Sequence, residues 1–253
     1  MAKPAEPPCP RCGGEGFVWQ GPTPAYPDGS WRPCGCLQRA LQRRRLAEMM
    51  RRSGLDEATM ARWSFETFRP ALARGDAAAR EGLARAKEAC EAYAREPRGW
   101  LVLAGPYGCG KSHLAYATAA AVYRRGGSVL VSTVPDLLES LRQGFAEGAG
   151  GESFDARFAA VRDAELLVLD DLGAQQDTPW GAEKLYQIVD FRLRRRLPLI
   201  VTTNVNLYEP RGRLEPRLLS RLLEGANLPD GFSQVFLIAV GDYRTRPAAA
   251  EGR

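Results

Sequence analysis

The sequence predicts an α/β fold in which a parallel sheet of five strands is flanked by helices. Three observations lead to this prediction. Short apolar runs alternate with helical stretches over residues 98–243, as in strands joined by helical crossovers. The runs are almost continuously hydrophobic, which is typical of strands buried on both faces. A glycine-rich loop joins the first run to the first helical stretch.

The elements are expected in a simple order along the chain. Residues 37–97 are predicted to be mostly helical, with breaks near Ser53–Gly54 and at Phe65–Pro70. The glycines between Gly144 and Glu152 predict a mobile loop. The strands are expected at Trp100–Ala104, Val129–Ser132, Leu166–Asp170, Leu199–Thr203 and Val235–Val240.

Length and composition favour a cytoplasmic protein. The chain has 253 residues, enough for one α/β domain and a small appendage. No run approaches the roughly 20 apolar residues of a membrane span. The segment Met1–Pro10 is rich in proline and lacks the apolar core of a secretory signal. We therefore expect neither export nor a membrane partner.

The charge is basic and unevenly distributed. The formal net charge is +5 and the isoelectric point is about 9.0. Basic clusters fit binding to a polyanion, or are simply solvated helix faces. The stretch Leu37–Arg52 is a connector, a partner-binding helix or a DNA contact, and its residues do not choose between these. The clustered arginines are Arg39, Arg43, Arg44, Arg45, Arg51 and Arg52, and then Arg192, Arg194, Arg195 and Arg196.

The segment GPYGCGKS matches the phosphate-binding motif G-x-x-x-x-G-K-[ST] between a strand and a helix. Glycines let backbone N–H groups face phosphate oxygens, and the helix N-terminus adds favourable partial charge. Lys111 is expected to reach the β- and γ-phosphates, and the Ser112 hydroxyl to hold Mg²⁺. The predicted ATP contacts are Gly105, Pro106, Tyr107, Gly108, Cys109, Gly110, Lys111, Ser112 and His113.

Polar residues end the third and fourth predicted strands. In LLVLDD, Asp170 is predicted to hold Mg²⁺, and Asp171 to orient and polarise the attacking water. In LIVTTN, Asn204 is placed to hydrogen-bond that water or the γ-phosphate. The pair of acids falls about one βα unit after the glycine-rich loop, as in other folds with this loop.

A helix is expected to carry Arg217 and Arg221 on one face, because they are four residues apart. A guanidinium offered to the γ-phosphate of a neighbouring subunit neutralises charge that develops in the transition state. A surface pair of ion-paired arginines gives the same sequence pattern.

Four cysteines near the start predict a structural zinc site. The spacing C-P-R-C-G-G is that of a zinc knuckle, and C-G-C supplies a second pair. A segment of about 36 residues is too short to fold by apolar burial alone, so a metal meets a physical need. The aromatic residues Phe17, Trp19, Tyr26 and Trp31 stack on bases, dock a protein or form the module's own small core, and we favour a core for at least two. The predicted ligands are Cys9, Cys12, Cys34 and Cys36.

Taken together, GPYGCGKSHLA, LLVLDDLG, EKLYQIVDFRL, LIVTTN, PRLLSRL and GDYR resemble the DnaC/DnaI/IstB branch of AAA+ ATPases. The resemblance implies the strand order 5-1-4-3-2, a lid that is absent or minimal, Asn204 as sensor 1 and Arg221 as the arginine finger, with Arg217 beside it. It also implies that Val134–Phe145 forms an extra helix facing single-stranded DNA. Many AAA+ proteins carry Glu where this chain has Asp171.

The predicted organisation has four parts: a zinc-binding module over 1–36, a helical arginine-rich linker over 37–64, an AAA+ ATPase domain over 65–244 and a tail over 245–253. The cofactors implied are ATP, Mg²⁺ and Zn²⁺. DnaI-type loaders resemble this layout, and there the zinc module contacts the replicative helicase.

Three functions are compatible with the sequence. The first is a loader that self-associates on single-stranded DNA, hydrolyses ATP at subunit interfaces and delivers a DnaB-type replicative helicase. The second is an IstB-like transposition regulator that forms ATP-dependent filaments on duplex DNA. The third is a nucleotide-gated adaptor with little turnover. The zinc module favours the loader, because IstB-like chains usually begin with a helical domain.

Overall fold

The computed structural model divides the chain into two compact units, Met1–Met49 and Met50–Arg253. Three predicted segments lie wholly or mostly outside the described residues: the arginine-rich stretch beyond Leu41, the loop expected at 144–152 and the tail over 245–253. Among the residues that are described, no helix is both long and apolar enough to cross a membrane. The described residues are 9–37, 39–41, 57–73, 75–146, 153–176, 178–208, 214–228 and 231–242.

The first unit contains an antiparallel hairpin that the sequence analysis did not predict. Strand β1 (Phe17–Gln20) pairs with β2 (Ser30–Pro33), with Trp19 opposite Trp31. Gly29 has a φ of +78°, and a Cβ there would lie 2.2 Å from the Trp19 ring, so the turn requires glycine.

The aromatic residues of this unit do not form a core, contrary to our expectation for at least two of them. The side chains of Trp19 and Trp31 are in contact, with ring centroids 5.4 Å apart, yet these residues are 49% and 61% exposed. Phe17 and Tyr26 are exposed as well. A hairpin of this size has one layer only, so among the described residues of this unit its aromatic side chains stay largely exposed.

The second unit contains a parallel sheet of five strands in the order β4-β5-β6-β3-β7. Numbered by their place in this unit, the strands run 2-3-4-1-5, which read from the other edge is the expected order 5-1-4-3-2. The α/β prediction is therefore confirmed. The strands are β3 (Trp100–Ala104), β4 (Val129–Thr133), β5 (Leu166–Leu172), β6 (Leu199–Thr203) and β7 (Ser233–Leu237).

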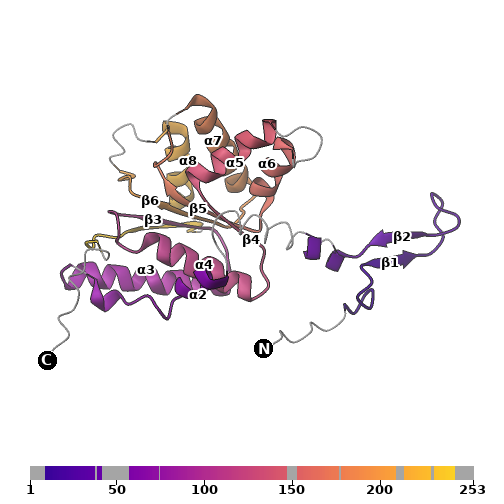
Figure 1. Cartoon of the computed structure of the whole chain (residues 1–253), viewed down its shortest axis with the longest axis horizontal. Coiled ribbons are helices and arrows are strands. Elements are labelled where there is room, and N and C mark those ends of the chain that lie inside the picture. The colour runs from indigo at the N-terminus through magenta and orange to yellow at the C-terminus, as the bar shows by residue number, and fades with distance from the viewer. Residues whose placement is uncertain are drawn as a thin grey trace. The chain divides into compact units, whose positions relative to one another are not determined.

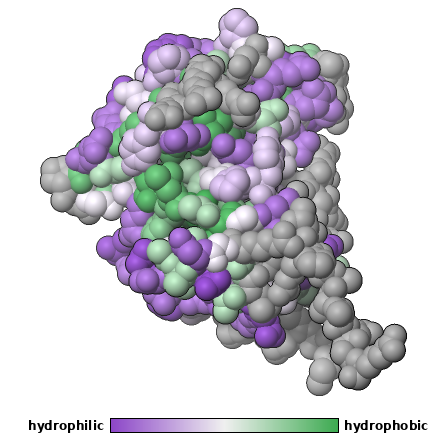
Figure 2. Space-filling model, turned by 90° about the vertical axis from the view of Figure 1, so that its left-hand side faces the viewer, coloured by the Kyte–Doolittle hydropathy of each residue, from purple (hydrophilic) through white to green (hydrophobic). Residues whose placement is uncertain are grey.

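Helices cover both faces of the sheet (Figure 1). On one face, α3 packs against α4, and α2 also contacts α4; on the other face lie α5, α6, α7 and α8. Figure 2 shows hydrophobic residues gathered in a band at the level of the sheet, with hydrophilic residues on the layers above and below. The helices are α2 (Glu57–Arg62), the short 3₁₀ helix η1 (Pro70–Leu72), α3 (Ala77–Arg95), α4 (Lys111–Arg124), α5 (Val134–Ala146), α6 (Phe154–Asp163), α7 (Pro179–Arg194) and α8 (Pro216–Asn227).

The last predicted strand was misplaced by two residues at its start. The sequence indicated Val235–Val240, whereas β7 runs from Ser233 to Leu237. This strand pairs only with β3 and so forms one edge of the sheet. Ser233 is the only buried residue of β7, so a search for continuous apolar runs selects the wrong boundaries.

In the second basic cluster, Arg192 differs from the prediction that these arginines are solvated or bind a polyanion. Arg192 is fully buried, so it is neither a solvated residue nor a polyanion contact. Its guanidinium donates hydrogen bonds to the carbonyl oxygens of Arg162 (2.9 Å) and Pro198 (2.5 Å). Arg192 thus joins the end of α6 to the segment that enters β6.

Candidate functional site

The glycine-rich loop connects β3 to α4 and is fixed by close packing. Gly110 caps α4 with a φ of +101°, and a Cβ there would lie 2.7 Å from the ring of Phe68. Only glycine fits this conformation without strain. The loop therefore presents its backbone and the N-terminus of α4 to one side of the sheet, as an anion site requires.

Lys111 is the first residue of α4, and it is almost fully buried. Its ammonium donates to the carbonyl oxygen of Pro106 at 2.7 Å and lies 3.7 Å from Cys109 Sγ. The charge is thus held over the glycine-rich loop. Burial raises the pKa of the Cys109 thiol, so this residue is a neutral neighbour of the lysine.

Asp170 lies beside the loop and accepts hydrogen bonds from three hydroxyl groups. Ser112 Oγ donates to Oδ1 at 2.8 Å, Thr202 Oγ1 donates to Oδ1 at 2.5 Å, and Tyr116 Oη donates to Oδ2 at 2.6 Å. Burial, together with the negative charge of Asp170, raises the pKa of Tyr116, so the phenol stays protonated. The hydroxyl of Ser112 and the carboxylate of Asp170 are hard oxygen ligands in contact, which fits Mg²⁺.

Asp171 and Asn204 are brought together at the same edge of the sheet. The pairing of β5 with β6 is irregular between Leu169 and Leu172, and Asp171 has a left-handed φ of 58°. Its backbone N–H donates to Thr202 Oγ1 at 2.9 Å, and its Oδ1 accepts from Asn204 Nδ2 at 2.7 Å. A non-glycine residue in this conformation is strained, which is common at functional sites.

One pocket of about 650 Å³ collects these groups. His113 is half-buried in its wall, with Nε2 2.9 Å from the carbonyl oxygen of Ser64 and 3.2 Å from Thr67 Oγ1. Burial lowers the pKa of His113, so its ring is neutral and holds the segment before α3 against α4. The lining also includes Trp63, Phe68, Arg69, Tyr107, Gly108, Gly110, Lys111, Ser112, Tyr116, Thr133, Asp170, Asp171 and Asn204.

Arg217 and Arg221 lie on α8 and do not line this pocket. Arg217 pairs with Glu215 at 2.7 Å and stacks over the ring of Tyr186. Arg221 pairs with the buried carboxylate of Asp190 at 3.0 Å and also contacts Glu224. Within one chain, neither arginine therefore completes the nucleotide pocket.

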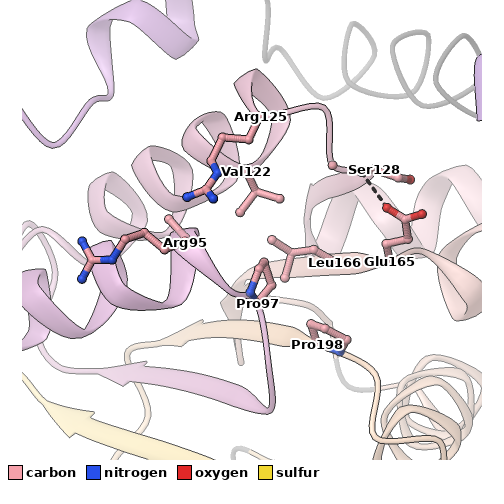
Figure 3. A pocket seen from close by; sticks show the side chains of 10 residues that line it. Arg95, Pro97, Val122, Arg125, Ser128, Glu165, Leu166 and Pro198 are labelled. Atoms are coloured by element: carbon pink, nitrogen blue, oxygen red, sulfur yellow. Dashed lines mark hydrogen bonds between the residues drawn. The ribbon is translucent and has the colours of Figure 1, made fainter.

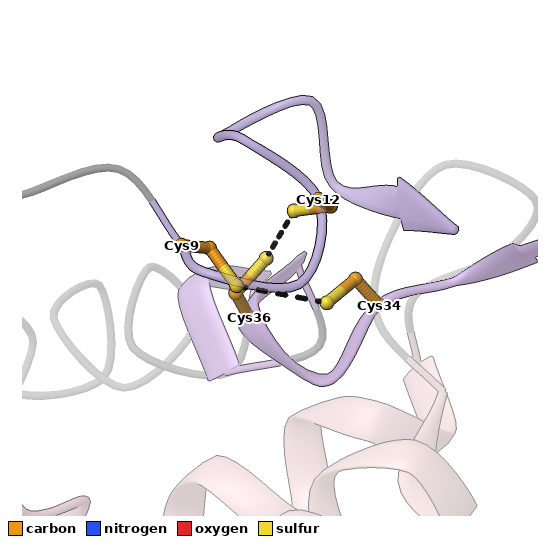
Figure 4. A group of neighbouring side chains, drawn as sticks. All are labelled: Cys9, Cys12, Cys34 and Cys36. Atoms are coloured by element: carbon orange, nitrogen blue, oxygen red, sulfur yellow. Dashed lines mark hydrogen bonds between the residues drawn. The ribbon is translucent and has the colours of Figure 1, made fainter. Parts of the chain in front are cut away.

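The four cysteines of the first unit form one cluster (Figure 4). Their sulfur atoms all lie within 4.8 Å of one another, with 3.2 Å between Cys12 and Cys36 and 3.8 Å between Cys9 and Cys34. Four thiolates at about 2.3 Å from a zinc ion lie about 3.8 Å apart, so the cluster fits one tetrahedral ion. Backbone N–H groups of Arg11 and Cys12 lower the pKa of Cys9 to about 6, whereas the hydrogen bond with Cys12 raises the pKa of Cys36 to about 12.

Sequence reasoning missed two hydroxyl groups at Asp170. Thr202 lies two residues before Asn204, inside the apolar strand, where alternation places it toward the acids. Tyr116 is four residues after Ser112, so helical spacing places both on the same face of α4. These spacings were the available signals: Thr202 lies inside LIVTTN but was given no role, and Tyr116 lies just beyond GPYGCGKSHLA.

A second hollow, of about 310 Å³, lies at the opposite ends of the strands, between α3, α4 and the start of β5 (Figure 3). Arg95 and Arg125 lie at one end of it, and Glu165 at the other accepts from the backbone N–H of Ser128 at 2.9 Å. Its polar groups do not converge on one point, and it contains none of the predicted site residues.

The sequence is similar to a family of ATP-binding proteins and to members of it from bacteria. A family model described as IstB-like ATP binding protein matches residues 38–223. The replicative helicase loader DnaC of Escherichia coli K12 is 31% identical over 128 residues, 51% of this chain and 51% of that protein. An ATP-binding protein of an insertion sequence in Mycobacterium tuberculosis H37Rv is 35% identical over 104 residues, 41% of this chain and 40% of that protein. The chain thus spans about half the length of these curated relatives.

Solved structures share the fold at low sequence identity. A DnaC helicase loader has a TM-score of 0.56 at 23% identity and covers 71% of this chain and 98% of its own. DnaI has a TM-score of 0.55 at 21% identity, covering 74% and 95%. DnaA bound to AMPPCP and single-stranded DNA has a TM-score of 0.53 at 21% identity, covering 71% and 50%. The predicted AAA+ fold and the resemblance to the DnaC/DnaI/IstB branch are confirmed.

Proposed function

Since the chain belongs to the family of IstB-like ATP-binding proteins, we propose that it is an ATPase that loads a DnaB-type replicative helicase onto single-stranded DNA. One observation carries this proposal: a four-cysteine unit with an exposed aromatic face is joined in one chain to an ATP-binding unit similar to DnaC. The first unit supplies a protein contact, and the second supplies the nucleotide cycle.

The pocket geometry supports the ATPase part of the proposal. Lys111 leaves the Pro106 carbonyl and turns to the β- and γ-phosphates of ATP, since a phosphate oxygen is the stronger acceptor. Ser112 and Asp170 would hold Mg²⁺, which would supply positive charge to the phosphates. Asp171 orients the attacking water, and Asn204 fixes the carboxylate of Asp171 through their hydrogen bond.

The position of Arg221 supports hydrolysis between subunits. It lies outside the pocket of its own chain, and its ion pair with Asp190 restricts its rotamers. A neighbouring subunit that packs with its pocket against α8 receives this guanidinium at its γ-phosphate. Self-association is therefore part of the proposed cycle.

A row of aromatic and basic side chains on α5, α6 and α7 supports binding of single-stranded DNA. Phe145 is 63% exposed and stacks on Phe154, with ring centroids 4.2 Å apart. Arg142 lies over the ring of Trp180 at 5.2 Å, and Lys184 lies over Phe154 at 5.3 Å. Bases stack on such rings while cations pair with the phosphates, independently of sequence.

The hairpin face supports contact with the helicase. Trp19 and Trp31 are exposed together on one side of β1 and β2. Neighbouring positions in a strand point to opposite faces, so Arg32 lies on the other side. Exposed tryptophans in a protein contact often contribute much of the binding energy.

The test is assembly with the replicative helicase of the same genome. We expect a defined complex by native mass spectrometry when ATP and Mg²⁺ are present. The complex should be lost on deletion of residues 1–36, and weakened about tenfold or more by Trp31→Ser. Arg32→Ser, on the opposite face of the same strand, is the matched control and should retain the complex. Absence of any complex in every nucleotide state refutes the loader.

The insertion-sequence relative favours a second candidate function. A transposition regulator of IstB type assembles on duplex DNA rather than with a helicase. Electron microscopy of the chain with ATP and long duplex DNA distinguishes the two. Regular filaments on duplex DNA, together with no helicase complex, select this alternative.

A further inference from the structure

Both carboxylate oxygens of Asp170 accept hydrogen bonds. The sequence motifs supply donors to Oδ1 only. Asp170 is 5% exposed. Ser112, from the phosphate-binding motif, and Thr202, from β6, both donate to Oδ1. The other oxygen, Oδ2, accepts from Tyr116 Oη at 2.6 Å. A buried carboxylate oxygen without a donor carries a large desolvation cost, so this single bond matters.

Tyr116 itself is fixed by its surroundings. It lies one turn after Ser112 on α4, so the two hydroxyl groups approach Asp170 from the same helix. Its ring packs against the edge of Trp63, with centroids 4.8 Å apart. A phenol between a helix and an aromatic neighbour has few rotamers, and its hydroxyl is presented at one place.

We propose that Tyr116 is a positioning residue that sets the orientation of Asp170 for Mg²⁺. This inference rests on the proposed function, in which the pocket binds ATP with its metal. A carboxylate is symmetric and turns about its Cβ–Cγ bond, which exchanges the two oxygens. The Tyr116 bond occupies Oδ2, so Oδ1, which is bonded to Ser112, would be the oxygen offered to Mg²⁺. Partners of this kind orient metal ligands and tune their affinity.

Tyr116→Phe is the direct test, because it removes one oxygen and keeps the ring against Trp63. Tyr93→Phe is the matched control: Tyr93 is a buried tyrosine whose hydroxyl donates to the carbonyl oxygen of Gly99 at 2.8 Å, outside the pocket. Calorimetric titration measures ATP affinity at a series of Mg²⁺ concentrations and in EDTA. Paramagnetic resonance measures Mn²⁺ bound to the protein–ATP complex.

The titration gives the Mg²⁺ concentration at which half of the metal-dependent gain in ATP affinity is reached. We expect Tyr116→Phe to raise this concentration by about tenfold or more. Mn²⁺ binding should weaken in the same variant, and ATP affinity in EDTA should be unchanged. Tyr93→Phe should leave all three quantities as in the wild type. A Tyr116→Phe protein with wild-type metal dependence overturns the proposal, and so does one that loses ATP affinity equally with and without metal.

A double-mutant cycle separates positioning from general packing. In the Asp170→Asn variant, the carboxylate proposed to bind Mg²⁺ is replaced by a neutral amide. Removal of the Tyr116 hydroxyl from this variant should then have little further effect on metal affinity. Full additivity of the two changes contradicts the inference. If the wild-type chain binds no ATP in the presence of Mg²⁺, the proposed function itself fails; that result is distinct from a wild-type metal response in Tyr116→Phe.

Discussion

Asn204 directly follows β6, and its amide donates to Asp171, whose backbone is left-handed. The two side chains come from neighbouring strands, so their contact depends on the register of β5 against β6. Thr202 reinforces that register by accepting from the Asp171 N–H and donating to Asp170. Single contacts at the strand ends thus fix the spacing of the predicted catalytic groups.

Replacing Asn204 with Ala should lower the rate of ATP hydrolysis by roughly 100-fold, since one positioned donor to a catalytic group is lost. ATP affinity should change little, because the phosphate loop and Lys111 are untouched. Stopped-flow and steady-state assays of kcat and KM measure both. The control is Asn206→Ala, whose side chain accepts from the Tyr208 N–H outside the pocket. Equal rates in the two variants contradict the role of Asn204.

Among the elements, α7 depends on one buried charge. Arg192 ties it to the carbonyl groups at the end of α6 and before β6, and burial lowers the pKa of Arg192 to about 10. The guanidinium remains charged at neutral pH, and carbonyl oxygens take the place of a counter-ion. Removal of the donor leaves those oxygens buried and unpaired.

We therefore expect Arg192→Met to lower the free energy of unfolding by about 3 kcal/mol, measured by urea denaturation. Methionine keeps the unbranched stem of the side chain and removes the guanidinium with its donors. Arg194→Met is the control, because its side chain is 72% exposed and its ion pair with Asp190 contributes about 1 kcal/mol or less. A small, equal effect of both changes would show that Arg192 has no special part in the fold.

The cysteine cluster should hold one zinc ion per chain. Elemental analysis of Cys36→Ser should show loss of the ion, while Cys90→Ala, in the core of the other unit, should retain it. The hairpin buries too little to fold without the metal, so chelation should remove its NMR signals and leave those of the parallel sheet. Retention of hairpin signals after complete zinc removal would refute a structural metal.

How far the elements follow from sequence depends on burial. The starts of β3, β4, β5 and β6 were predicted correctly, because strands buried on both faces are continuous apolar runs. β7 has one buried residue, Ser233, and therefore gave a weak signal. The hairpin strands β1 and β2 are too short to show alternation, and their signals were weak as well. The motifs brought Lys111, Ser112, Asp170, Asp171 and Asn204 to one pocket. Tyr116 was indicated only by its helical spacing from Ser112, and the burial of Arg192 depends on packing that no local pattern encodes.

At the scale of the whole molecule, Arg221 lies outside the pocket of its own chain. Under the proposed function, ATP hydrolysis is therefore a property of an assembly. If Arg221 acts on the site of a neighbouring subunit, Arg221→Ala should reduce ATP turnover by roughly 1,000-fold, the order of effect known for arginines supplied in this way. Lys111→Ala should be equally inactive, because it lacks the phosphate-binding ammonium. A surface role for Arg221 predicts near-normal turnover.

Mixing the two inactive proteins tests the shared site. An Arg221→Ala subunit keeps an intact pocket, and a Lys111→Ala subunit offers it an intact arginine. Turnover should therefore reappear in the mixture and rise with protein concentration. Failure of the mixture to recover, with both variants folded and self-associating, would place the site within one chain.

The strand order has a consequence for how the molecule is made. β3, which leads into the glycine-rich loop, pairs with β6 and β7, so Trp100 lies opposite Leu199 and Ser233. A ribosome releases β3 long before either neighbour, and non-local pairing of this kind is slow. The nascent strand must wait, with its apolar residues in need of protection from other chains. The chain can therefore bind ATP only late in its synthesis, after Leu237 has been added.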